Sequence, residues 1–80
     1  MRGYAEEDAE MRAGDRVEVT VTTNCAARSD QGTLIELRGW NFEFGKRINR
    51  WAVVWIDRCA NGRPTNRGIS ISDRMLRRIA

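Results

Sequence analysis

The chain alternates between hydrophobic and polar residues in several short stretches, a pattern typical of β-strands. The longest apolar run covers residues 50–57, Arg-Trp-Ala-Val-Val-Trp-Ile-Asp. In an extended chain its side chains point alternately to two sides, and both sides are apolar. One side carries Trp51, Val53 and Trp55, and the other carries Ala52, Val54 and Ile56. We therefore predict a central strand that the rest of the domain covers on both faces.

Shorter alternating segments predict further strands. Residues 16–22 form a first strand that points three valines, the last of them Val21, toward the core. Residues 31–37 form a second strand, with Gly32 at a bend or bulge. The remaining elements are a short fourth strand at residues 69–72, a single helical turn capped by Ser72 or Asp73, and a fifth strand at residues 77–79.

Residues 39–49 predict a long hairpin that leads into the central strand. Trp40, Phe42 and Phe44 alternate with polar residues, and the Gly-Lys pair that follows can turn the chain back. The far end of this hairpin would carry the cations Lys46, Arg47 and Arg50. We expect the three rings to pack at the end of the folded domain rather than to form a binding face.

Length and composition favour one small domain. Residues 1–12 are rich in acidic side chains and should form a flexible acidic N-terminal arm, while residues 13–80 form the folded domain. No apolar run approaches the ~20 residues of a membrane span and no hydrophobic leader is present, so we expect a cytoplasmic protein with no membrane partner. Cys25 and Cys59 are the only cysteines and histidine is absent, which excludes a structural zinc site and favours two free thiols over a disulfide.

The order and spacing of these segments resemble those of SH3-like barrels. Four segments carry the resemblance: residues 14–17 (Gly-Asp-Arg-Val), 31–34 (Gln-Gly-Thr-Leu), 53–57 (Val-Val-Trp-Ile-Asp) and 75–79 (Met-Leu-Arg-Arg-Ile). The resemblance implies an all-β fold, a small SH3-like five-stranded barrel with one helical turn before the last strand. KOW-type domains of ribosomal and transcription proteins are similar at the first two segments, which implies RNA or protein binding. The photosystem I subunit IV group and the ferredoxin–thioredoxin reductase variable chain are similar in layout and imply a docking subunit.

The type II dihydrofolate reductases, tetrameric barrels with a pore lined by a Val-Gln-Ile-Tyr strand, are also similar. Residues 69–72, Ile-Ser-Ile-Ser, and residues 76–79, Leu-Arg-Arg-Ile, correspond in position. Ser70 stands where that family has its pore glutamine, and Ser72 stands where it has tyrosine. The groups that would hold the ligand are therefore missing. This alternative implies a homo-oligomer with a ligand pore.

Charge is distributed unevenly along the chain. Between Arg38 and Arg78, ten basic residues stand against three acidic ones, an excess of seven positive charges, although the whole chain carries only +3. Thirteen of the fourteen basic residues are arginine, whose planar fork binds carboxylate or phosphate with two parallel hydrogen bonds. The basic half of the chain therefore favours a negatively charged partner.

Groups that could perform catalysis are scarce. Without histidine, neither a Ser–His nor a Cys–His pair can form, and no glycine-rich phosphate loop follows a strand. We expect no catalysis, no cofactor and no metal. We predict a non-catalytic binding module that docks on an acidic protein surface or a nucleoprotein, as an accessory protein of a phage or mobile element would. The alternative is RNA or DNA binding, because exposed rings can stack on bases beside basic side chains. The predicted contact residues are Trp40, Arg47, Arg50, Arg58, Arg63 and Arg67.

Overall fold

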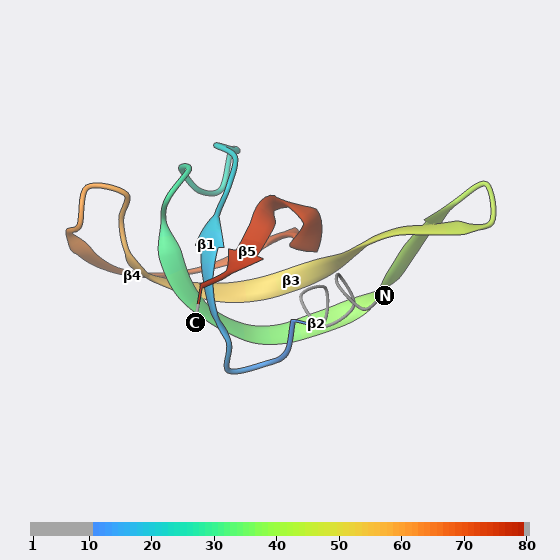
Figure 1. Ribbon diagram of the computed structural model, residues 1–80, viewed down its shortest axis with the longest axis horizontal. Coiled ribbons are helices and arrows are strands. Elements are labelled where there is room, and N and C mark those ends of the chain that lie inside the picture. The colour runs from blue at the N-terminus through green and yellow to red at the C-terminus, as the bar shows by residue number, and fades with distance from the viewer. Residues whose placement is uncertain (1–10, 80) are drawn as a thin grey trace, which may run out of the picture.

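Five strands and one short helical turn make up the computed structural model, which describes residues 11–79 (Figure 1). The elements are β1 (Arg16–Val19), β2 (Gln31–Glu43), β3 (Lys46–Arg58), β4 (Pro64–Ser72), the 3₁₀ turn η1 (Asp73–Met75) and β5 (Leu76–Arg78). Residues 1–10 of the proposed acidic arm lie outside the described residues, whereas Met11 packs against the core. Within residues 11–79 no helix is long and apolar enough to cross a membrane.

The strands form a single antiparallel sheet in the order β4-β3-β2-β1-β5. The sheet curls so that β5 returns to pair with β1, which produces the predicted five-stranded SH3-like barrel (Figure 1). Ser72 caps η1, since its hydroxyl accepts a hydrogen bond from the backbone N–H of Arg74 at 3.3 Å. The helical turn before the last strand is therefore confirmed.

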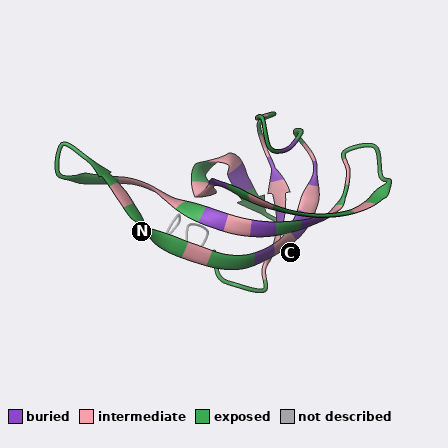
Figure 2. Cartoon of the chain, turned by 180° about the vertical axis from the view of Figure 1, so that it is seen from behind, coloured by how far each residue is buried: buried purple, intermediate pink, exposed green. Residues whose placement is uncertain are grey.

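The core lies on the inner face of the curled sheet (Figure 2). Alternate residues of β3 are fully buried, but Trp51 and Trp55 on its other face are 43% and 44% exposed. The prediction that this strand is covered on both faces is wrong, because the single sheet supplies a second layer only where it folds over its own inner face. The buried core consists of Val17, Val19, Ala26, Leu34, Ala52, Val54, Ile56, Ile71 and Leu76.

Gly32 permits a close approach between β2 and β3 at a register shift. A Cβ atom at this position would lie 2.1 Å from the carbonyl oxygen of Trp55, far inside van der Waals contact. The predicted bulge at Gly32 is therefore required by the backbone of the neighbouring strand.

The first strand is shorter than its valine pattern predicts. It ends at Val19, and the next residue, Thr20, donates its backbone N–H to the carbonyl of Met75 at 2.9 Å. The chain then leaves the sheet as a loop, so Val21 is 51% exposed rather than buried. Alternation predicts which side chains share a face, but it does not predict where strand pairing stops.

The outer halves of β2 and β3 continue past the barrel as a projecting hairpin (Figure 1). Their pairing continues to Glu43 and Lys46, and Phe44 and Gly45 form a two-residue turn. Both turn residues have positive φ, 53° and 77°, as in a type I′ turn. We call residues 38–50 the distal hairpin. It contributes to a longest molecular dimension of 39 Å.

Candidate functional site

The structure divides the predicted contact residues among three places. Trp40, Arg47 and Arg50 lie together on the distal hairpin, whereas Arg58 and Arg63 lie at the β3–β4 connection, at the other end of the long axis (Figure 1). Arg67 lies within β4. Sequence proximity grouped the last three arginines in one loop, but strand pairing separates Arg67 from the other two.

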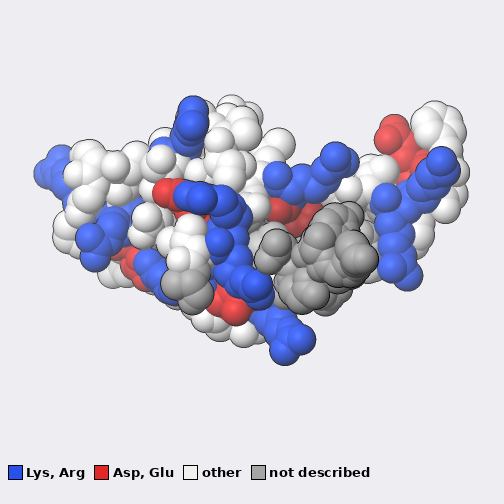
Figure 3. All heavy atoms as spheres, viewed as in Figure 1, with Lys and Arg blue, Asp and Glu red and all other residues white. Residues whose placement is uncertain are grey.

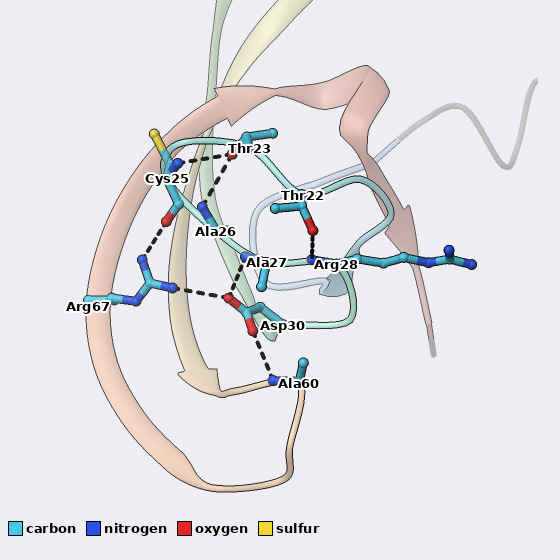
Figure 4. A network of polar contacts seen from close by, with 9 residues as sticks. All are labelled: Thr22, Thr23, Cys25, Ala26, Ala27, Arg28, Asp30, Ala60 and Arg67. Carbon is cyan, nitrogen blue, oxygen red and sulfur yellow. Dashed lines mark hydrogen bonds and ion pairs between the residues drawn. The ribbon is translucent and has the colours of Figure 1, made fainter.

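Arg67 is held by contacts within the chain (Figure 4). Its guanidinium donates to the carboxylate of Asp30 at 3.0 Å and to the carbonyl of Cys25. The Asp30 side chain is only 3% exposed, and it also accepts backbone N–H groups from Ala27 at 3.0 Å and Ala60 at 2.9 Å. This Asp30–Arg67 clasp fastens β4 to the loop after β1. Arg67 therefore closes the barrel, a role that its sequence context did not reveal.

The distal hairpin gathers rings and guanidinium groups on one side. Trp40 is paired with Arg50 across the two strands, and Phe42 is paired with Arg47, so each pair projects from the same face of the ribbon. The Cζ atoms of Arg47 and Arg50 lie 5.1 Å and 5.6 Å from the centroid of the Trp40 ring, within cation–π range. We call these four residues the arginine–aromatic face.

The aromatic side chains of the distal hairpin are exposed instead of packed at the end of the barrel. Trp40 is 41% exposed, Phe42 62% and Phe44 95%. The expectation of packing fails because the hairpin projects beyond the part of the sheet that curls over the core. Trp40, the one ring among the predicted contact residues, is the least exposed of the three because two arginines lie against it.

The two arginines of this face are held differently. Arg50 donates from Nε to the carbonyl of Arg38 at 2.9 Å and from Nη2 to the carbonyl of Leu37 at 3.3 Å. It therefore braces the hairpin. Arg47 is exposed, and its guanidinium lies over the Trp40 ring. Its guanidinium donors are consequently open to a partner.

Much of the positive charge on the barrel is already neutralised. Arg16 forms an ion pair with Asp57 at 2.7 Å, and Arg77 pairs with Glu18. The Arg16 hydrogen bond holds the pKa of Asp57 below its ordinary value, and the Arg77 hydrogen bond does the same to the pKa of Glu18. Within residues 11–79 no such ion pair engages Lys46 or Arg47 on the hairpin, nor Arg58 or Arg63 at the β3–β4 connection. Figure 3 shows basic side chains beside acidic ones over the barrel, and on the hairpin a second basic group with a smaller acidic area beside it.

An open apolar hollow of about 240 Å³ lies beside β4, where the reductase-like alternative would place its pore strand. It is smaller than the roughly 300–1,000 Å³ of typical small-molecule sites. Its described lining contains no carboxylate or basic group: Thr23, Asn24, Cys25, Trp51, Ser70, Ile71, Ser72 and Met75. Cys25 and Cys59 are free thiols, and residues 11–79 contain no cluster of three potential metal ligands.

Searches against protein-family models, curated proteins and solved structures find no match to this chain.

Proposed function

We propose that this chain is a non-catalytic binding module that docks on a negatively charged macromolecule, a protein or a nucleoprotein, through the arginine–aromatic face of its distal hairpin. The observation that carries the proposal is the collection of exposed rings and guanidinium groups on one side of a projecting two-stranded ribbon. Of the predicted contact residues, the proposal keeps Trp40, Arg47 and Arg50 on the hairpin. It leaves out Arg67, which is engaged in the clasp, and Arg58 and Arg63, which lie at the other end of the molecule.

The arrangement suits a binding surface for physical reasons. A guanidinium that rests on an indole ring has already lost part of its rotational freedom, so less entropy is lost when it binds an anion. Trp and Arg are also among the residues that most often dominate the energy of macromolecular contacts. Exposed aromatic area near unneutralised cations combines apolar attraction with charge complementarity.

The described lining of the hollow offers no carboxylate or basic side chain for acid–base chemistry. The reductase-like alternative requires a tetramer with Ser70 and Ser72 in a shared pore. Light scattering therefore tests it directly, since a monomer at micromolar concentration would eliminate that alternative.

Retention on immobilised heparin, a generic polyanion, tests the proposed site. Arg47→Ala and Arg28→Ala each remove one positive charge, and Arg28 extends away from the barrel in the loop after β1 (Figure 4). We expect Arg47→Ala to elute at a clearly lower salt concentration than the wild-type protein, and Arg28→Ala to elute close to it. Equal shifts for the two variants would mean that only net charge matters, which would overturn the assignment to the hairpin.

The double variant Arg63→Ala/Arg67→Ala tests the earlier loop assignment in the same experiment. If its retention matches that of the wild-type protein while it remains folded by circular dichroism, the β3–β4 connection makes no contact. Because the double variant removes two positive charges, a loss more than twice that of Arg47→Ala would return the site to the loop.

A further inference from the structure

We infer that the partner is a nucleoprotein and that the hairpin contacts its single-stranded nucleic acid, with Phe42 and Phe44 stacking on bases while Lys46 and Arg47 contact phosphates. The inference rests on the proposed function, because it names the partner of the same hairpin. Trp40 is assigned as a positioning residue that holds the two guanidinium groups rather than as a stacking ring, because Arg47 and Arg50 already lie against it.

The hairpin tip presents an aromatic ring where the fold alone would favour another residue. Phe44 has φ 53°, a left-handed conformation that aromatic side chains rarely adopt, and its side chain is 95% exposed. It therefore contributes almost no burial to the fold, while its backbone conformation is unfavourable. Such a combination at the outermost point of a projecting element is typical of a side chain used for contact.

The alternation of ring and cation along the ribbon matches the chemistry of a polynucleotide. Each nucleotide offers a flat π-face and a phosphate, and every base can stack on an exposed ring. An acidic peptide offers charge but no regular flat surface for Phe42 and Phe44. Phe42 lies across the ribbon from Arg47, and Phe44 is separated from Lys46 by one residue, so each ring has a cation close to it.

The exposed rings favour a single strand over a duplex. In a duplex the bases stack on one another and present only their edges in the grooves, whereas an unpaired base can be splayed onto an aromatic side chain. Phe42 and Phe44 carry no polar atoms that could read base edges. We therefore expect binding that depends on unpaired bases and varies little with sequence.

Fluorescence anisotropy of a labelled 15-nucleotide single strand, measured at several salt concentrations, tests the inference on the full chain. Phe42→Ala and Phe44→Ala should each weaken binding roughly tenfold, with the dependence on salt unchanged. Arg47→Ala should weaken binding and lower the slope of log K against log salt by about 0.7, the value for one lost phosphate contact on a single strand. Val21→Ala, which trims a solvent-exposed apolar side chain outside the hairpin, is the control and should change nothing.

A duplex of the same sequence and a polyglutamate of similar charge distinguish failure of single-strand recognition from failure of the proposed function. Equal or tighter binding of the duplex, or binding of polyglutamate alone, would overturn single-strand recognition while leaving a negatively charged partner in place. Unchanged single-strand affinity in both phenylalanine variants would also overturn it. If the wild-type protein binds none of the three ligands at low salt, the proposed function itself fails.

Discussion

Phe44 makes opposite contributions to folding and to the proposed binding. The turn needs positive φ at both central positions, for which Asn-Gly is the favoured pair, and Gly45 already fills the second position. Phe44→Asn should therefore stabilise the protein by about 0.5–1 kcal/mol, measured by urea denaturation. The same variant should bind the single-stranded oligonucleotide more weakly. A residue with a purely structural role would not separate stability from affinity in this way.

Phe44→Leu is the control for that prediction. Leucine keeps an apolar side chain but has the same difficulty with positive φ, so the free energy of unfolding should stay close to that of the wild-type protein. A loss of stability in Phe44→Asn would show that the ring makes a contact that favours the folded state, and the argument for a strained contact residue would then be wrong.

Asp30 should be the polar residue whose loss harms the fold most. Its buried carboxylate satisfies two backbone N–H groups and the guanidinium of Arg67. Asp30→Ala leaves these donors without their acceptor, and we expect a loss of about 2–3 kcal/mol in the free energy of unfolding, at the low end for a broken buried pair because Arg67 is 42% exposed. Glu43→Ala, an exposed change on the hairpin, should cost under about 0.5 kcal/mol. Similar effects of the two substitutions would show that the clasp contributes little.

The close approach of β2 and β3 at Gly32 depends on the absence of a side chain there. Gly32→Ala would place Cβ 2.1 Å from the Trp55 carbonyl oxygen, so both strands must shift. We expect a loss of at least about 3 kcal/mol, because backbone cannot yield as a side-chain end does. Gly39→Ala meets nothing within 4 Å and should be neutral or slightly stabilising. Equal thermal midpoints for the two variants would contradict this account of the bulge.

Local patterns in the sequence were sufficient to predict five strands, the bulge at Gly32, a cap at Ser72 or Asp73 and the long hairpin. Each depends on alternation or on residues close together in the chain. The patterns did not predict every strand boundary, since β1 ends at Val19 and not at residue 22, and β4 begins at Pro64 and not at residue 69. The Asp30–Arg67 clasp was missed because its partners are 37 residues apart and only strand pairing brings them together. The exposure of Phe42 and of Trp55 was missed for a related reason. Whether an apolar side chain is covered depends on where the sheet curls, and alternation carries no information about that.

Acid should lower the free energy of unfolding, because it protonates the carboxylates of two ion pairs that link neighbouring parts of the sheet. The pKa of Asp57 is lowered from its ordinary value of 3.8, mainly by the hydrogen bond from Arg16, and the pKa of Glu18 is lowered from 4.5, mainly by Arg77. Because the pKa of each carboxyl group is lower in the folded state, its ion pair contributes fully to stability at a pH above the pKa of that group in the unfolded chain. This contribution is lost as the pH falls from the unfolded-state pKa toward the folded-state pKa. The relevant window therefore lies below about pH 4.5.

Urea denaturation of the wild-type protein and Asp57→Asn across the acid range isolates this contribution. Above about pH 5 the variant should be less stable by under about 1 kcal/mol, because the Asp57 side chain is 39% exposed and solvent screens the pair. The difference should shrink as the pH falls below about 4 and vanish near pH 2, where the wild-type carboxylate is also protonated. Glu43→Gln, which removes no ion pair within residues 11–79, should follow the wild-type curve throughout. A difference between wild type and Asp57→Asn that stays constant with pH would instead assign the effect to packing of the side chain, not to its charge.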